Sequence, residues 1–218
     1  MRLRIEEVEA RIAAACRKAG RERDSVLLLA VTKVFPASAI VEAYSFGLRD
    51  FGENYVQEFE TKAPLVRSLD GARFHLIGHL QSNKSRRAAE LFDTVQTVDS
   101  EKLARRLNEC GRPMDVMIEV KLSEEASKHG CEPGQIGALI SAMRPFEYLR
   151  LRGLMTMPPW SDDPETARPY FRRLRALAEE HGLRELSMGM SGDLEVAIEE
   201  GSTIVRVGTA LFGSRRVE

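Results

Sequence analysis

Cysteine is scarce in this chain of 218 residues, which carries Cys16, Cys110 and Cys131. Three cysteines at wide spacing, without a CxxC pair or interleaved histidines, exclude a disulfide framework and argue against a zinc site. Such usage is typical of proteins in the reducing cytoplasm, where we expect the chain to act. No apolar run approaches the ~20 residues that cross a bilayer, and the charged N-terminus lacks a signal core. We therefore expect an unprocessed protein with no membrane partner.

Charge of one sign is not in excess either. The 32 lysines and arginines balance 33 aspartates and glutamates, for a formal net charge of -1. A balanced chain has no global field that attracts nucleic acid, so we expect no nucleic-acid partner. The acidic residues show no metal-ligand spacing after a strand, and we assign no metal. A Gly-x-Gly-x-x-Gly fingerprint is missing after the first apolar run, which argues against dinucleotide binding.

Apolar runs and helical patterns alternate along the chain. An amphipathic helix is expected over residues 3–19, and eight strand candidates follow, separated by helical segments. Eight βα units close a TIM-type barrel. We therefore predict the α/β class, as a single (β/α)8 barrel domain over residues 1–218 with one extra N-terminal helix. A doubly wound open sheet shows the same alternation and is the competing architecture. The strand candidates are residues 26–31, 50–52, 74–77, 94–98, 115–120, 149–154, 185–188 and 203–207.

Two turns of small residues near the C-terminus carry the strongest functional signal. They are Ser187-Met188-Gly189-Met190-Ser191-Gly192-Asp193 and Val205-Arg206-Val207-Gly208-Thr209-Ala210-Leu211-Phe212-Gly213, and each is typical of a strand that runs through a turn into a helix. Backbone N–H groups at such a turn, beside a hydroxyl, bind phosphate. The loops after strands seven and eight are also where TIM-type barrels often hold phosphate. We predict one phosphate shared by both turns.

Two cations stand at or near strand ends. Lys33 follows a nearly continuous apolar run, and a partly desolvated lysine has a free amine that can form a Schiff base with an aldehyde. The alternative for Lys33 is that its side chain extends from the strand end into solvent. Arg206 lies within the last strand, where a lone buried charge is costly, so it must face a ligand or pair with a carboxylate such as Glu53.

An amine, a phosphate turn and an arginine in one barrel mouth together describe a site for pyridoxal 5′-phosphate (PLP), with Arg206 opposite the ring nitrogen. A different reading is a barrel that acts on sugar phosphates through a Schiff base without any cofactor. The segment 157–164, rich in proline, follows the sixth strand on the same face, and we expect it to be a rigid, irregular loop near the site.

The chain resembles the pyridoxal phosphate homeostasis protein family, whose barrel is similar to that of alanine racemase. The resemblance runs nearly end to end, through residues 30–33, 51–58, 74–84, 153–157, 186–191 and 205–213. It implies a fold-type III PLP barrel, with Lys33 as the Schiff-base lysine and Arg206 near the pyridine nitrogen. It further implies a phosphate site made by Ser187, Ser191, Gly208 and Thr209. By the same resemblance, the pocket is lined by Asn54, His79 and Met190. Residues 124–131 also match a family block, in which Lys128 is either a secondary PLP contact or a solvated loop lysine.

Racemases of this fold type carry an additional β-domain that supplies a second acid/base, and this sequence ends about five residues after Gly213. We therefore expect no C-terminal β-domain and no robust catalytic activity. The resemblance implies a PLP-binding protein, expected to be a monomer, that acts in intracellular PLP homeostasis and delivers PLP to apo-enzymes. The alternative is a low-activity PLP-dependent amino-acid racemase with Lys33 as base. His79 is the candidate second acid/base, although a histidine at a strand end is more often a packed residue.

Overall fold

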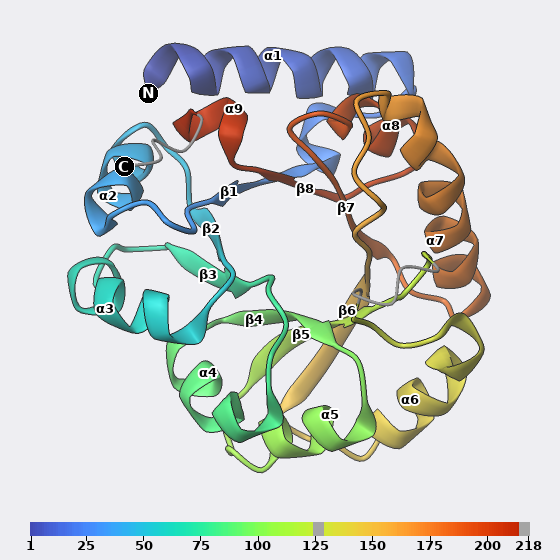
Figure 1. Ribbon diagram of the computed structural model, residues 1–218. Helices are drawn as coiled ribbons and strands as arrows, with labels where there is room; N and C mark the ends of the chain where they lie inside the picture. Colours follow the sequence, from blue (N-terminus) through green and yellow to red (C-terminus); the bar gives the residue numbers. More distant parts are fainter. Residues whose placement is uncertain (124–128, 214–218) are drawn as a thin grey trace.

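The computed structural model describes residues 1–123 and 129–213, so Lys128 lies outside the described residues. Eight parallel strands form a closed barrel in chain order, and helices surround it (Figure 1). The strands are β1 (Leu27–Val31), β2 (Asp50–Glu53), β3 (Arg73–Leu76), β4 (Thr94–Val98), β5 (Met114–Glu119), β6 (Leu149–Met155), β7 (Glu185–Met190) and β8 (Ile204–Val207). The helices are α1 (Arg2–Lys18), α2 (Ala37–Ser45), α3 (Val56–Val66), α4 (Ser85–Leu91), α5 (Glu101–Asn108), α6 (Ile136–Met143), α7 (Arg168–Glu180), α8 (Leu194–Glu199) and α9 (Thr209–Phe212).

Pairing of the first strand with the last closes the barrel. Leu29 of β1 lies opposite Arg206 of β8, and the two strands run parallel through four residue pairs. An open doubly wound sheet would leave two edge strands, so this pairing decides in favour of the predicted barrel. No helix in the described part of the chain combines the length and apolarity needed to cross a bilayer.

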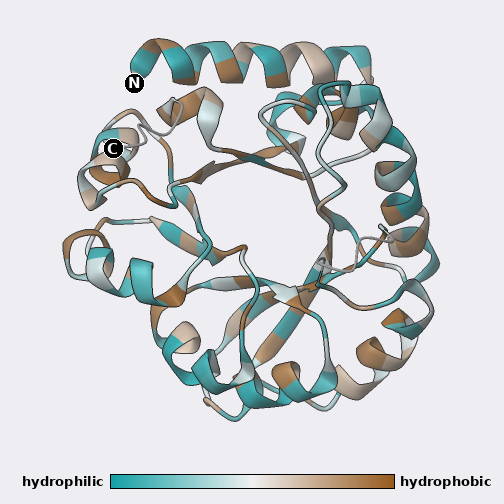
Figure 2. Cartoon of the chain, viewed as in Figure 1, coloured by the Kyte–Doolittle hydropathy of each residue, from teal (hydrophilic) through white to brown (hydrophobic). Residues whose placement is uncertain are grey.

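Alternate strand residues face two different environments. On β1, Leu28 and Ala30 belong to the large cluster between strands and helices, whereas Leu29 and Val31 belong to a smaller cluster with Ile77, Met117, Met155 and Ile204. This division follows from the two-residue period of a strand, which sends neighbouring side chains to opposite faces. Figure 2 shows hydrophobic and hydrophilic residues mixed along the surrounding helices.

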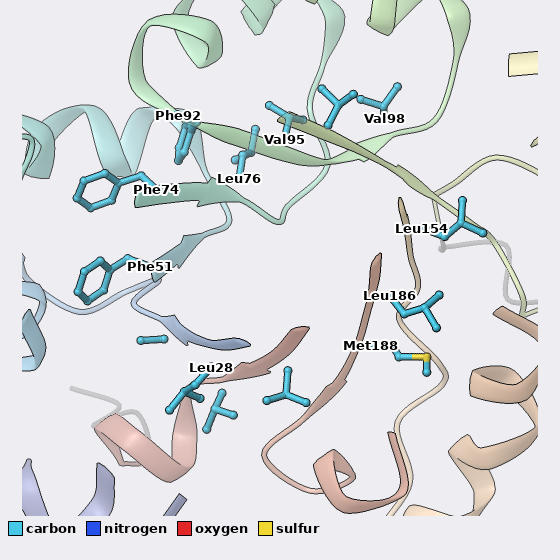
Figure 3. Packing of buried hydrophobic residues seen from close by; sticks show 14 of the residues in the cluster. Leu28, Phe51, Phe74, Leu76, Phe92, Val95, Val98, Leu154, Leu186 and Met188 are labelled. Carbon is cyan, nitrogen blue, oxygen red and sulfur yellow. The ribbon is translucent and has the colours of Figure 1, made fainter. Parts of the chain in front are cut away.

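Phenylalanines fill much of the layer between strands and helices on one side of the barrel. Phe51, Phe74 and Phe92 point into this layer (Figure 3), and the Phe59 ring of α3 lies 4.7 Å from Phe74 and 4.9 Å from Phe92. All four rings are fully buried. Burial of a phenyl ring stabilises a fold by about 1.5–3 kcal/mol, so this group anchors β2, β3 and α3 relative to one another.

The extra N-terminal helix is present as α1, which packs along α8 and α9 across the outside of the barrel (Figure 1). Its buried residues include Ile5, Val8, Ile12 and Cys16, which repeat at helical spacing as predicted. Leu3 was expected on the same face but is 73% exposed, because at 100° per residue it lies on the opposite side of the helix from Ile5 and Val8.

Candidate functional site

A cavity of about 280 Å3 opens at the carboxyl ends of the strands. This is the end of the barrel where enzymes of this architecture keep their sites. Its walls come from β1, β2, the loop after β6, and the turns after β7 and β8. The lining residues are Val31, Lys33, Asn54, Ile77, Met157, Pro159, Trp160, Ser161, Asp163, Pro164, Thr166, Ala167, Met190, Ser191, Gly192, Asp193, Arg206, Gly208 and Thr209.

The cavity brings together most of the residues that the sequence singled out. Lys33 and Arg206, from adjacent strands, line it together with residues of the two predicted turns. The proline-rich loop 157–164 forms one wall, as predicted. Trp160 and Asp193 lie in the predicted loop and turn, although neither was singled out as a site residue. The predicted site residues that line the cavity are Lys33, Asn54, Met190, Ser191, Arg206, Gly208 and Thr209.

Ser187, which was expected beside a phosphate, is not among the residues that line this cavity. The side chain is fully buried inside the barrel, and its hydroxyl is engaged at 2.8 Å with Arg206 Nη1 and at 2.6 Å with Gln96 Oε1. The reason is geometric, because Ser187 pairs with Ile204 near the start of β8, whereas Met190 reaches the level of Arg206. Ser187 therefore supports Arg206 from inside the barrel.

His79 also lies outside the cavity lining. Its ring stacks on His129 at a centroid distance of 3.8 Å, and its Nδ1 lies 3.7 Å from Asp99 Oδ2. Partial burial lowers the pKa of His79, the neighbouring His129 lowers it further, and Asp99 opposes both. The structure thus gives His79 a stacking partner at the rim rather than the expected position in the pocket wall.

Arg206 is held by two acceptors and stays charged. Nη1 donates to Ser187 Oγ and Nη2 donates to the Thr156 carbonyl oxygen, each at 2.8 Å. Burial lowers the pKa of Arg206 to about 10, with Asp193 and Glu119 acting in the opposite direction. The guanidinium is therefore protonated at neutral pH. The alternative of a salt bridge to Glu53 is wrong, because Glu53 binds a different cation.

That cation is Lys62, which the sequence analysis did not identify. Its ammonium on α3 lies 2.8 Å from Glu53 Oε1, 2.7 Å from Glu58 Oε1 and 2.9 Å from the Thr32 carbonyl oxygen. Glu58 Oε1 also accepts the backbone N–H of Val34, which has a φ of 63°. The residues on both sides of Lys33 are thus fixed by one ion cluster. The four-residue spacing of Glu58 and Lys62 on a helix was the sequence signal for it.

The two small-residue turns lie side by side, as predicted. Ser191 Oγ in the first turn accepts the backbone N–H of Ala210 in the second at 3.3 Å. A Cβ added at Gly192 would meet nothing within 4 Å, so the backbone at this turn borders open space. From outside the barrel, Arg11 of α1 donates to the Ser191 carbonyl oxygen and to both carboxylate oxygens of Glu195. Helix α1 therefore braces the first turn.

A close backbone approach sets the position of Asn54. A Cβ added at Gly78 would lie 2.1 Å from the Asn54 carbonyl oxygen, well inside van der Waals contact. Only glycine permits the segment after β3 to approach the end of β2 this closely. The approach brings Asn54 to the mouth of the barrel beside Lys33.

The donor set suits one class of ligand. An amine can condense with an aldehyde, a fixed guanidinium can donate to a ring nitrogen or an anion, and hydroxyl and backbone N–H groups at two adjacent turns can hold a phosphate. The open space beside Gly192 provides room for such a group. Within residues 1–123 and 129–213, no group of three or more His, Cys, Asp or Glu side chains is arranged to hold a metal ion.

Comparisons with known proteins agree with this site. The model of the family described as "Alanine racemase, N-terminal domain" matches residues 4–216. A pyridoxal phosphate homeostasis protein from Pseudomonas aeruginosa is 48% identical over 97% of this chain and 94% of its own length. The structure of PipY from Synechococcus elongatus with PLP bound superposes with a TM-score of 0.82 at 39% identity, covering 93% of this chain and all of PipY.

An alanine racemase from Clostridium difficile shares the fold alone, with a TM-score of 0.69 at 14% identity. The match covers 96% of this chain and 57% of the racemase. The family is shown by the matching family model and by the high identity to the Pseudomonas protein over nearly the full length of both chains. This chain belongs to the pyridoxal phosphate homeostasis protein family, whose members carry the alanine racemase N-terminal domain.

Proposed function

We propose that this protein binds PLP in the cavity at the carboxyl ends of the strands and acts in PLP homeostasis. The observation that carries the proposal is that Lys33 and Arg206 line one cavity together with both small-residue turns. The relatives support it, since the Pseudomonas protein is named for PLP homeostasis and PipY has been solved with PLP. The proposal treats residues 1–218 as one PLP-binding domain that works in the cytoplasm as a monomer.

Each end of the ligand has a complementary group in the cavity. When bound, PLP supplies an aldehyde that condenses with the Lys33 amine to a Schiff base, with release of water. Ser191, Gly208 and Thr209 would hold the phosphate, and Arg206 would face the ring nitrogen. Asn54 and Met190 would form the sides of the pocket.

The charge on Arg206 favours holding the cofactor over catalysis. A guanidinium that keeps its own proton cannot protonate the ring nitrogen, so the ring is a weak sink for electrons. The two fixed acceptors, Ser187 Oγ and the Thr156 carbonyl oxygen, keep the guanidinium in one orientation. These contacts suit Arg206 to binding the cofactor ring. They provide no group that would assist efficient proton abstraction from a substrate.

The racemase alternative needs a second acid/base on the opposite face of the ligand. His79 was the candidate, but it stacks on His129 and does not line the cavity. Incorporation of solvent deuterium at the α-carbon of an amino acid, measured for wild type and for Lys33→Ala, tests this alternative. Exchange that depends on Lys33 and proceeds at enzymatic rates would favour a racemase.

Delivery to apo-enzymes requires that the cofactor leave through an accessible mouth. Trp160 lines the cavity and is 80% exposed, and Val34 and Tyr55, next in sequence to Lys33 and Asn54, are also exposed. Exposed apolar side chains around a mouth favour contact with another protein surface. Transfer of PLP from the loaded protein to an apo PLP-enzyme should therefore be faster than its release into buffer, and equal rates would count against delivery.

The visible absorption spectrum of the protein with added PLP tests the site itself. We expect a band for the Schiff base that borohydride traps on Lys33 and that Lys33→Ala abolishes. A matched control is Lys102→Ala, which removes a lysine from helix α5, outside the cavity lining. A colourless wild-type protein would instead favour a barrel that acts on sugar phosphates without a cofactor.

A further inference from the structure

A continuous line of hydrogen bonds crosses the interior of the barrel. It starts at Arg206 on β8 and passes through Ser187 on β7, Gln96 on β4 and His75 on β3 to Asp50 on β2. The successive distances are 2.8 Å, 2.6 Å, 3.2 Å and 3.0 Å. Barrel interiors of this type are normally filled by branched apolar side chains, so a polar line through one calls for an explanation.

Each hydrogen bond in the line runs in one direction. Arginine can only donate, so Ser187 Oγ accepts from Arg206, and the Ser187 hydroxyl donates to Gln96 Oε1. The amide nitrogen of Gln96 then faces His75 Nδ1 and donates to it. His75 therefore carries its proton on Nε2, where it donates to Asp50 Oδ1.

The line connects two cavities at opposite ends of the barrel. Arg206 lines the cavity described above, whereas Asp50 and His75 line a second cavity of about 290 Å3 at the amino ends of the strands. Gln96 and Ser187, between them, are fully buried. The orientation of the guanidinium thus depends on groups that lie far from any ligand in the first cavity.

We propose that Gln96, His75 and Asp50 are positioning residues that act through Ser187 to fix the Arg206 guanidinium for the ring of the bound cofactor. This inference rests on the proposed function for the role of Arg206. It adds a function for the buried polar residues of β2, β3 and β4. Removal of Gln96 leaves the Ser187 hydroxyl without its acceptor, and Arg206 then loses the fixed orientation of one of its two partners. His75 and Asp50 act one step further away, by fixing which way the Gln96 amide faces.

The hydrogen bond at His75 Nδ1 depends on which way the Gln96 amide faces. A second proton on Nδ1 would face the Gln96 amide nitrogen, donor against donor, and the amide could satisfy it only by turning over. The turned amide would present its nitrogen to Ser187 and displace the hydroxyl proton from its acceptor. The charged groups that share the cavity with His75 are Asp50, Asp24, Arg73, Asp115, Arg152 and Glu185, of which Arg73 pairs with Asp115 and Arg152 with Glu185.

Gln96→Met tests the link to the cofactor, since methionine has a similar shape and cannot make either hydrogen bond. We expect PLP to bind roughly threefold to tenfold more weakly, as for the loss of one buried hydrogen bond, and the pH profile of the visible band to change. Thr94→Val is the matched control: Thr94 lies two residues earlier on β4, is buried, and its hydroxyl has no partner among the described residues. The control should bind PLP like wild type.

Ser187→Ala provides a readout that needs no cofactor. It leaves Gln96 Oε1 without its donor, so the Gln96 amide is free to turn over. The hydrogen bond from its nitrogen to His75 Nδ1 should then weaken and shift the imidazole 15N signals of His75 at a fixed pH. Imidazole 15N NMR measures this change between two residues that do not touch. Unchanged 15N signals of His75 in Ser187→Ala, or unchanged PLP affinity and pH profile in Gln96→Met, would overturn the inference. Failure of wild type to bind PLP would instead overturn the proposed function, and the NMR result would stand separately.

Discussion

The ammonium of Lys62 lies 2.9 Å from the carbonyl oxygen of Thr32, the residue directly before Lys33. One helix side chain thus holds the backbone that presents the reactive amine, and it also neutralises the fully buried Glu53. A buried ion cluster costs desolvation free energy, and this one fixes the backbone on both sides of Lys33 through Thr32 and Val34.

Lys62→Met should destabilise the protein by about 3–5 kcal/mol, because it leaves the Glu53 carboxylate buried without a cation. Urea-induced unfolding followed by circular dichroism measures the loss. Adding Glu53→Gln to Lys62→Met should recover part of it, since the uncompensated charge is then gone. If the stability losses of Lys62→Met and Glu53→Gln simply added in the double variant, the two residues would not be energetically coupled.

The pKa of Glu53 provides a test with a definite sign. Desolvation raises this pKa above its ordinary value of 4.5, against the lowering effects of Lys62 and Thr32. Between 4.5 and the raised value the native state binds more protons than the unfolded state, so the free energy of unfolding falls as pH rises through that window. Glu53→Gln removes this component. Relative to wild type, the variant should therefore become more stable as pH rises, and parallel stability curves would show that Glu53 has no raised pKa.

Arg11 should matter for ligand binding although it lies on the outer helix α1. Arg11→Ala removes the hydrogen bond to the Ser191 carbonyl oxygen and the ion pair to Glu195, so the first turn loses its brace. We expect roughly twofold to fivefold weaker PLP binding, and a stability loss of up to about 1 kcal/mol because the pair is partly exposed. Fluorescence titration with PLP measures the affinity.

Glu9→Ala is the control for this experiment. It breaks a comparable pair, in which Arg23 donates to both oxygens of Glu9, on the same helix but away from the turns. Its stability loss should be similar and its PLP affinity unchanged. Equal loss of affinity in both variants would mean that α1 acts only through overall stability.

Two glycines near the cavity should differ in how well they tolerate alanine. Gly78→Ala places a methyl group 2.1 Å from the Asn54 carbonyl oxygen and should lower the free energy of unfolding by about 1–3 kcal/mol or more. Gly192→Ala adds a methyl group in open space and should leave the melting temperature nearly unchanged. Thermal unfolding of both variants, without PLP, compares them directly. A stable Gly78→Ala protein would mean that the β3 segment can move away from Asn54.

His79 should titrate below the ordinary histidine value, because burial and His129 both lower its pKa. Asp99→Asn removes the opposing carboxylate and should lower the pKa of His79 further, whereas His129→Ala should raise it. Since the folded protein then binds fewer protons than the unfolded chain, the contribution of His79 to stability is complete above pH 6.5 and is lost as pH falls through its folded pKa. NMR titration of the imidazole C–H signals distinguishes these changes, and identical midpoints in all three proteins would contradict the assignment of causes.

Much of this architecture could be predicted because its signals are local. A run such as Leu27–Val31 predicts a buried strand by composition, and the count of eight strands predicts closure. The two turns are short and contiguous, so Ser191, Gly208 and Thr209 could be placed at the mouth from sequence alone. Lys33 and Arg206 followed because each stands at or near the carboxyl end of a predicted strand.

The remaining features of the site depend on contacts between residues that are far apart in the sequence. Ser187 belongs to the correct strand, but its depth depends on the register between β7 and β8, which shifts between Ser187 and Met190. The stacking of His79 on His129 could not be predicted, because His129 lies fifty residues later in the sequence. The Lys62 cluster was missed because a charged helix residue is usually solvated, and only packing of α3 on the barrel reveals that this one is buried.

Closure of the barrel by β1 and β8 has a consequence for the timing of synthesis. Lys33 follows the first strand to leave the ribosome, whereas Arg206 and the second turn belong to the last, and the two strands are adjacent only in the finished ring. A nascent chain therefore carries the amine long before it has the groups that recognise the rest of the ligand. The complete set of ligand-binding groups therefore comes together only when the last strand has joined the ring.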